Sequence, residues 1–305
     1  MMSAQCACCL QLFPRRAAKK SVRVSYRRLP MALQRINDTA LWVEDTDVSG
    51  AGERTALPTI VFSHGLLFST ALFTPQVAAL RANYRCVAYD HRGQGRSGAS
   101  DLRSISIELL YQDAVALIES LNVGPVHFVG LSMGGFVGMR LAARRPDLVR
   151  SLTVLDSSAD AEPAENMLRY RGLSAAARVI GVAPLTSRVM KIVVAKSTLD
   201  DPTRRADVQH WKTMVASNQR SIWRAVNGVI ERTAIYPELG RIICPTLVIV
   251  GDEDVATVPA KSERIVAAIK GARLVRIPRA GHSSSLEAPA AVNQALAEFL
   301  GQAQR

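Results

Sequence analysis

The stretch VGLSMGG at residues 129–135 decides the fold. It joins an apolar run that begins at Val126 to a helical pattern over Met133–Ala143. The motif G-x-S-x-G, placed on a tight turn between a strand and a helix, holds its serine in a strained backbone conformation and lifts the hydroxyl above the sheet. Glycine is needed two residues before and two residues after the serine, because neighbouring backbone approaches closely there. We therefore interpret Ser132 as a nucleophile. A phosphate-binding loop is disfavoured, because the Gly-Lys-Ser/Thr ending of such loops is absent.

Outward from this turn, short β-branched runs alternate with longer helical patterns. This alternation is typical of an α/β fold, with a mostly parallel sheet and helices on both faces. Eight strands are predicted, of which the first two form a hairpin: Leu33–Ile36, Leu41–Glu44, Thr59–Phe62, Cys86–Tyr89, Val126–Leu131, Leu152–Leu155, Thr246–Val250 and Arg273–Ile277. The helical patterns outside the middle of the chain are Ile105–Leu121, Met133–Ala143 and Ala288–Leu300.

The pattern changes between residues 157 and 241. The apolar spacing there is helical, no strand is predicted, and prolines interrupt the segment at Pro163, Pro184, Pro202 and Pro237. We expect residues 31–156 and 242–305 to form the core, and residues 157–241 to form a helical lid over the carboxyl edge of the sheet, where ligands of open α/β sheets bind. A helical decoration without contact to substrate is the alternative.

Charge and composition limit the class of protein. The net charge is +12, but seven positive charges lie in residues 1–30, which contain no acidic residue. Only five remain for the other 275 residues. Such a tail is typical of a solvated arm or a targeting segment, so we expect residues 1–30 to be a disordered basic leader, and we expect no nucleic-acid binding.

The cysteines indicate the compartment. Cys6, Cys8 and Cys9 crowd the leader, while Cys86 and Cys244 adjoin apolar strands and are interpreted as small core residues. Because the spacing indicates neither a disulfide framework nor a metal site, we expect a reducing, cytoplasmic environment. No apolar run of about 18 residues occurs, so no membrane span is predicted.

A nucleophilic serine needs a base, and five histidines are candidates. His64 and His91 suit loop positions, His127 sits inside a strand pattern, and His210 lies in the helical segment. His282 follows the last strand in a loop before the final helix, which returns its side chain to the top of the sheet. The sequence therefore predicts His282 as the general base.

The base in turn needs a carboxylate that orients it. Asp254 follows the strand Thr246–Val250, and the order serine, aspartate, histidine is the one expected when a G-x-S-x-G turn carries the nucleophile. We predict Asp254 as this acid. Asp156, at the end of an earlier strand, is the rival, and Asp252 and Glu253 are interpreted as turn or surface carboxylates.

Acyl transfer also needs N–H donors for the oxyanion. The N–H of Met133, directly after the nucleophile, is one predicted donor. The second is expected from the loop that follows Thr59–Phe62, with Leu66 preferred and Leu67 as the next choice.

Five segments together resemble the α/β-hydrolases: His64-Gly65, residues 89–97, residues 130–135, residues 251–254 and Gly281-His282. The resemblance covers about residues 33–301. The run GLSMGG and the stretch Ala280–Pro289 are similar to β-ketoadipate enol-lactone hydrolases and the related cofactor-free haloperoxidases. Haloalkane dehalogenases and epoxide hydrolases use an aspartate nucleophile, whereas position 132 is a serine.

The resemblance implies hydrolysis of a small carboxylic ester or lactone through a serine acyl-enzyme, with no metal or organic cofactor. Two alternatives remain open at this point. One is carbon–carbon bond hydrolysis of a ring-cleavage product by the same three residues, and the other is a ligand receptor built on a hydrolase scaffold. Arginines of the helical segment could suit a substrate carboxylate, but solvated faces are the favoured interpretation: Arg169, Arg171, Arg178 and Arg188.

Overall fold

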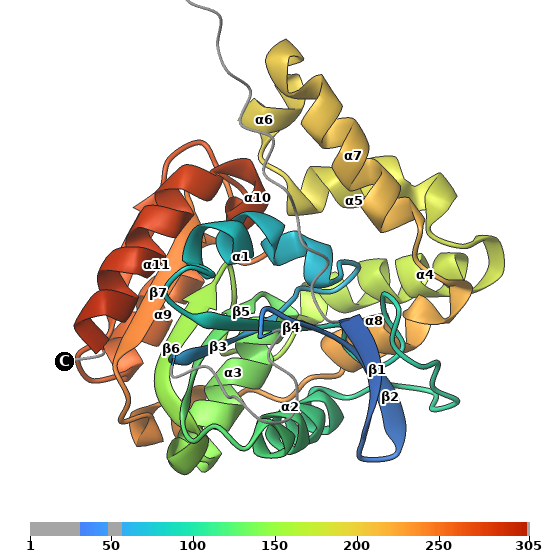
Figure 1. Cartoon of the computed structure of the whole chain (residues 1–305). Coiled ribbons are helices and arrows are strands. Elements are labelled where there is room, and N and C mark those ends of the chain that lie inside the picture. Colours follow the sequence, from blue (N-terminus) through green and yellow to red (C-terminus); the bar gives the residue numbers. More distant parts are fainter. Residues whose placement is uncertain (1–30, 48–56, 304–305) are drawn as a thin grey trace, which may run out of the picture.

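The computed structural model describes residues 31–47 and 57–303. The predicted basic leader, residues 1–30, lies outside these residues. Within the described part, eight strands form one sheet in the order β1-β2-β4-β3-β5-β6-β7-β8 (Figure 1). β1 pairs with β2, and β2 with β4, in antiparallel fashion, while all other neighbours are parallel. The predicted eight-stranded, mostly parallel sheet is confirmed.

The strand bounds agree closely with the predicted runs. They are β1 Met31–Ile36, β2 Thr39–Asp45, β3 Thr59–Ser63, β4 Arg85–Tyr89, β5 Val126–Leu131, β6 Val149–Leu155, β7 Thr246–Gly251 and β8 Arg273–Ile277. β3, β5 and β7 are buried along their whole length, as expected for parallel strands covered on both faces.

Helices cover both faces of the sheet. They are α1 Thr74–Leu80, α2 Ile107–Leu121, α3 Met133–Arg144, α4 Ala164–Ile180, α5 Thr186–Val193, α6 Lys196–Asp200, α7 Arg205–Ala216, α8 Trp223–Ile230, α9 Pro259–Ala268, α10 Ser284–Glu287 and α11 Pro289–Ala303. α1 packs with α11, and α2 packs with α3 on the other side of the sheet (Figure 1). α2 begins where the Ser106 side chain accepts a hydrogen bond from the Leu109 N–H.

Between β6 and β7 the chain forms helices α4–α8, and no strand occurs at residues 157–241, all of which are described. In Figure 1 these yellow to orange helices stand together on one side of the sheet. We call residues 157–241 the helical insertion. None of the helices in residues 31–47 and 57–303 is long and apolar enough to cross a membrane.

The strand order reverses direction at β3, and this reversal positions the site. From β3 the chain first moves outward to β4, and it then returns to β5 on the opposite side of β3. The carboxyl ends of β3 and β5 therefore flank a crevice, which is the usual ligand position in open α/β sheets. The loop after β3 and the turn after β5 carry Leu66 and Ser132.

A buried ion pair fixes the loop after β4 on α2. Two nitrogens of Arg92 donate to the two carboxylate oxygens of Asp113, at 2.7 and 2.6 Å. The side chains of Arg92 and Asp113 are 3% and 1% exposed. Arg92 also donates to Asp38 at 2.7 Å, but Asp38 is 78% exposed, so without Asp113 the buried guanidinium would keep only a solvent-screened partner.

We therefore expect Asp113→Ala to lower the free energy of unfolding by about 3–5 kcal/mol, measured by urea denaturation. The matched control is Asp147→Ala, which removes one of the surface partners of Arg145, leaves its pair with Glu119, and is expected to cost less than about 1 kcal/mol. Equal losses in the two variants would contradict this account.

Candidate functional site

Ser132 sits on a sharp turn whose shape is fixed by close backbone packing. Its φ of 53° and ψ of −111° lie in a region that non-glycine residues rarely adopt. A Cβ at Gly130 would clash with the carbonyl of Gly134, and a Cβ at Gly134 would clash with the carbonyl of Ser63. The glycine requirement predicted for this motif thus has a steric cause. The strained conformation is held because the Ser132 N–H donates to the Leu155 carbonyl at 2.9 Å.

The three residues predicted from the sequence meet at this turn. His282 Nε2 lies 2.8 Å from Ser132 Oγ, and His282 Nδ1 lies 2.9 Å from Asp254 Oδ2. A carboxylate oxygen only accepts, so the proton of the neutral imidazole sits on Nδ1. Nε2 is then free to accept the proton of the Ser132 hydroxyl.

Asp254 is buried, but several hydrogen-bond donors contact its carboxylate. Its Oδ1 accepts the N–H groups of Ala256 and Thr257 at 2.8 and 2.9 Å, and its Oδ2 accepts the Thr257 hydroxyl at 2.8 Å. Burial by itself would raise the pKa of Asp254, but the charge of His282 and these hydrogen bonds outweigh it and hold the pKa below 3.8. Asp254 therefore stays ionised at neutral pH.

The pKa of His282 is shifted in the opposite direction to that of Asp254. Burial disfavours its charged form, but the charge of Asp254 and the hydrogen bond to it outweigh burial and raise the pKa of His282 above 6.5. Asp156 and Glu287 add to the same direction. The imidazolium form is thus stabilised where a proton taken from Ser132 would arrive.

The rival carboxylate, Asp156, is close by but has other partners. It accepts the Gly251 N–H at 2.9 Å, and it accepts the N–H and the hydroxyl of Ser284 at 3.0 and 2.6 Å. Burial, reinforced by the charge of Asp254, raises the pKa of Asp156 to about 7. Asp156 thus joins the ends of β6 and β7 to the first residue of α10, whereas Asp254 makes the contact with the imidazole.

The loop after β3 is pinned so that one N–H remains free. The Leu67 N–H donates to Gln94 Oε1 at 3.1 Å, and the Leu67 carbonyl accepts from Asn218 at 2.7 Å. In residues 31–47 and 57–303, neither the Leu66 N–H nor the Met133 N–H has a hydrogen-bond partner. These are the two preferred donors from the sequence, and Leu67, the next choice, is already engaged.

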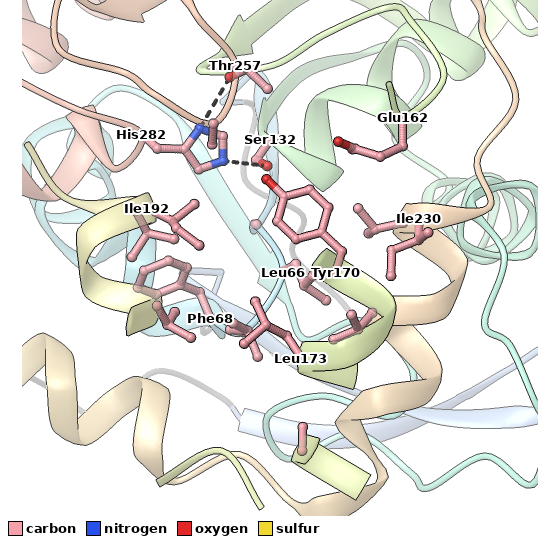
Figure 2. Close-up of a pocket in the computed structure, with 18 of the residues that line it drawn as sticks. Leu66, Phe68, Ser132, Glu162, Tyr170, Leu173, Ile192, Ile230, Thr257 and His282 are labelled. Carbon is pink, nitrogen blue, oxygen red and sulfur yellow. Dashed lines mark hydrogen bonds between the residues drawn. The ribbon is translucent and has the colours of Figure 1, made fainter. Parts of the chain in front are cut away.

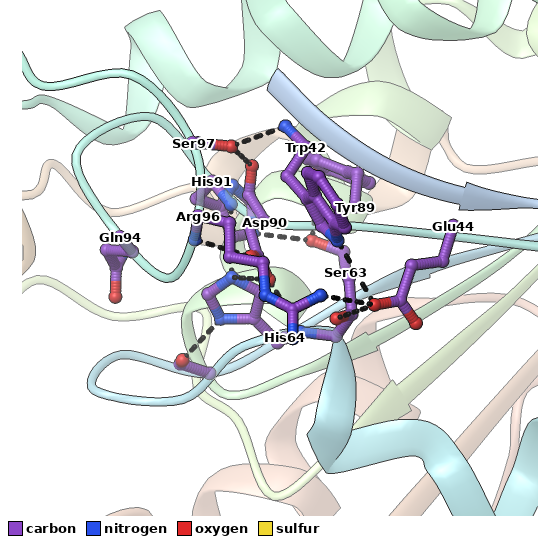
Figure 3. A network of polar contacts seen from close by, with 12 residues as sticks. Trp42, Glu44, Ser63, His64, Tyr89, Asp90, His91, Gln94, Arg96 and Ser97 are labelled. Atoms are coloured by element: carbon purple, nitrogen blue, oxygen red, sulfur yellow. Dashed lines mark hydrogen bonds and ion pairs between the residues drawn. The ribbon is translucent and has the colours of Figure 1, made fainter. Parts of the chain in front are cut away.

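A buried polar network underlies this loop (Figure 3). The His91 N–H donates to His64 Nε2 at 3.0 Å, so the proton of His64 sits on Nδ1 and is donated to the Gly65 carbonyl at 2.8 Å. Burial lowers the pKa of His64, which keeps it neutral. Asp90 accepts the N–H groups of Thr70 and Arg96, so it ties the loops after β3 and β4 together.

A cavity of about 160 Å³ opens beside Ser132 and His282 (Figure 2). Its walls come from the loop after β3 and from helices α4, α5 and α8 of the helical insertion, and they are mostly apolar, including Leu66, Phe68, Leu173, Ile192 and Ile230. The four arginines singled out in the sequence are exposed and do not line the cavity.

Three polar side chains of the insertion also face this cavity: Glu162, Tyr170 and Arg232. Arg232 donates to Glu162 Oε2 at 2.7 Å, and the two side chains are 3% and 10% exposed. The pair is neutral as a unit, so it presents no net charge to a ligand.

The carboxylate of Glu287 joins the helical insertion to the loop that carries His282. Glu287 accepts the Ala195 N–H at 2.8 Å through one oxygen and the Gly281 N–H at 2.9 Å through the other. A Cβ at Gly281 would crowd the Ala195 backbone, which explains the glycine before His282. Burial raises the pKa of Glu287.

Sequence reasoning missed four residues of this neighbourhood. Thr257 holds Asp254, Gln94 and Asn218 hold the loop after β3, and Glu287 holds the loop before His282. Thr257 carried a local signal, because a hydroxyl residue three positions after an aspartate often closes a turn onto it. Asn218 carried none, because its partner lies 151 residues away.

Comparisons with known proteins identify the family of this chain. Residues 60–295 match the model of the alpha/beta hydrolase family. The enol-lactonase of Burkholderia xenovorans LB400 is 28% identical with a TM-score of 0.79, covering 89% of this chain and 100% of that one. An esterase of Thermogutta terrifontis is 25% identical with a TM-score of 0.80, covering 90% and 98%.

A Variovorax paradoxus protein, provisionally named carbamate hydrolase RutD, is 30% identical over 79% of this chain and 91% of its own length. The family model covers more than half of the chain and includes the turn at Ser132, Asp254 and His282. This chain belongs to the alpha/beta hydrolase family.

Proposed function

We propose that this hydrolase cleaves a small carboxylic ester or lactone through an acyl-enzyme on Ser132, with His282 as general base and Asp254 as the residue that orients it. The observation that carries the proposal is the hydrogen-bond chain from Asp254 through His282 to the Ser132 hydroxyl, at the wall of an apolar cavity. Similarity to proteins named as an enol-lactonase and an esterase supports the same bond class.

In the first half-reaction, Ser132 Oγ attacks the carbonyl carbon while His282 Nε2 takes the hydroxyl proton. The carbonyl oxygen becomes an oxyanion, for which the free N–H groups of Leu66 and Met133 are the proposed donors. Met133 opens helix α3, so the positive end of the helix dipole favours negative charge at the same place. Collapse of the intermediate breaks the ester C–O bond, and His282 returns the proton to the departing alkoxide.

In the second half-reaction, water enters as the nucleophile and His282 takes its proton. The acyl–Ser132 bond breaks, the acid leaves, and the serine regains its proton from the imidazolium. These steps need no metal ion or organic cofactor.

The helical insertion is proposed as the lid that shapes the substrate site. Support comes from the cavity wall, because more than half of the residues that line it belong to the insertion, chiefly to α4, α5 and α8. An apolar enclosure favours an uncharged acyl group and strengthens the electrostatic contacts made inside it.

Carbamate hydrolysis is a second candidate, favoured by the Variovorax relative. A carbamate presents an ester-like carbonyl to the same three residues. Matched panels of esters, lactones, carbamates and vinylogous diketones separate these candidates from one another and from carbon–carbon bond hydrolysis.

Ser132→Ala is expected to reduce kcat on short-chain p-nitrophenyl esters by about 10⁴- to 10⁶-fold, because the nucleophile is lost. A fluorophosphonate probe should label the parent protein and not the variant, as read by intact mass spectrometry. Ser120→Ala, at an exposed serine on α2, is the control and should keep full activity. A folded parent protein that is neither labelled nor active would overturn the proposed function.

The pH profile should reflect the raised pKa of His282. The neutral imidazole is the active form, so activity is lost as the pH falls through this pKa, and the acid limb of kcat/KM should have its midpoint above pH 6.5. Asp254→Asn removes the charge that raises the pKa, so the midpoint should move down while kcat falls by about 10⁴-fold. An unchanged midpoint in this variant would argue against Asp254 as the partner of His282.

A further inference from the structure

Tyr170 presents a hydroxyl that the proposed chemistry has not yet used. It lies on α4 (Ala164–Ile180) and lines the same cavity as Ser132 and His282. Figure 2 shows its hydroxyl directed toward the Ser132–His282 pair. Within the part of the chain that the structure describes, this hydroxyl makes no hydrogen bond, and Tyr170 as a whole is half-buried.

The nearest carboxylate in the cavity does not explain the orientation of Tyr170. Both oxygens of Glu162 are already occupied, one by Asn166 Nδ2 at 3.0 Å and the other by Arg232 at 2.7 Å. The Tyr170 hydroxyl faces the cavity, where a bound ligand that replaces water can accept its hydrogen bond. The acceptor for Tyr170 is therefore sought on the substrate.

An ester or lactone has two oxygens at its reacting carbon. The carbonyl oxygen is assigned to the N–H groups of Leu66 and Met133 in the proposed function. The remaining acceptor is the single-bonded oxygen, which must lie near His282 Nε2 because it receives the proton from there. The Tyr170 hydroxyl points into this region.

Tyr170 is suited to donate a hydrogen bond without giving up its proton. Burial raises its pKa, and the negative charge of Glu162 adds to the effect against the opposing charges of Arg169 and Arg232. A phenol with a raised pKa stays protonated throughout the neutral range. His282 thus remains the proton donor to the leaving oxygen.

We propose that Tyr170 is a catalytic residue that donates a hydrogen bond to the single-bonded oxygen of the substrate and stabilises the charge that develops on it. In this step the bond from Ser132 Oγ to the acyl carbon is already formed, and the bond from that carbon to the leaving oxygen breaks. The electron pair goes to the leaving oxygen, the proton on His282 follows it, and Tyr170 keeps its own proton. The proposal rests on the proposed function, since it assigns a role within that reaction.

The test uses Tyr170→Phe and a series of esters of one small acid whose leaving alcohols range from p-nitrophenol to simple alkanols. The quantity measured is kcat/KM, which reports the acylation step. p-Nitrophenoxide leaves readily without help, so its ester should lose little. Alkyl esters should lose about 10- to 100-fold, because the hydrogen bond to a charged oxygen is removed. The loss should grow steadily with the pKa of the leaving alcohol.

Tyr111→Phe is the matched control. Tyr111 lies on α2 against Arg144 and does not line the cavity, so this variant should follow the parent protein on every ester. Thermal unfolding of both variants checks that each is folded, and removal of one unpaired hydroxyl should leave the Tm of the Tyr170 variant unchanged or raised.

Labelling by a fluorophosphonate separates failure of this proposal from failure of the proposed function. If Ser132 is labelled in both proteins and the loss in Tyr170→Phe is zero or the same for all leaving groups, the role of Tyr170 is overturned while the serine chemistry stands. If the parent protein is neither labelled nor active on any ester, the proposed function fails and the role of Tyr170 fails with it.

Discussion

The steric constraint on the turn at Ser132 is the feature on which the rest of the site depends. The backbone of β5 can enter α3 at this angle only because Gly130 and Gly134 carry no Cβ, since each faces a neighbouring carbonyl at close range. The strain at Ser132 is stored locally and held by β6, whose last residue, Leu155, accepts the Ser132 N–H. This geometry directs the hydroxyl toward His282 and leaves the Met133 N–H unpaired.

Around this turn, several polar side chains hold other groups of the site in place through hydrogen bonds. Thr257 fixes Asp254, Gln94 and Asn218 fix Leu67, and His64 fixes the Gly65 carbonyl. Buried groups with all their partners satisfied stay in one arrangement, so no reorganisation is needed when charge develops in a reaction. The Leu66 N–H, the Met133 N–H and the Tyr170 hydroxyl, all on residues beside Ser132 or the cavity, have no hydrogen-bond partner in residues 31–47 and 57–303, and these are the groups assigned to contact substrate.

The sequence predicted the strands of the sheet more completely than the helices and the residues that hold the site in place. β5 and β8 were predicted to the residue, whereas β6 begins three residues earlier than the apolar run, because Arg150 and Ser151 interrupt the pattern. α1 and α9 carried too weak a periodicity to be predicted, since α9 buries little beyond Ser262 and Ile265. The predicted site residues do meet. The contacts of Gln94 and Asn218 with Leu67, and of Glu287 with Ala195, span 27, 151 and 92 residues, and a single sequence carries no record of such contacts.

Glu287 connects the helical insertion to the loop of the core that carries His282. Its carboxylate binds the backbone at Ala195, between α5 and α6, and at Gly281, next to His282. An insertion taken from a related hydrolase would therefore have to bring a matching peptide N–H to this carboxylate, or else leave a buried acceptor empty beside the imidazole. The junction between α5 and α6 is thus constrained together with the core, because the Ala195 N–H and the Glu287 carboxylate have to match.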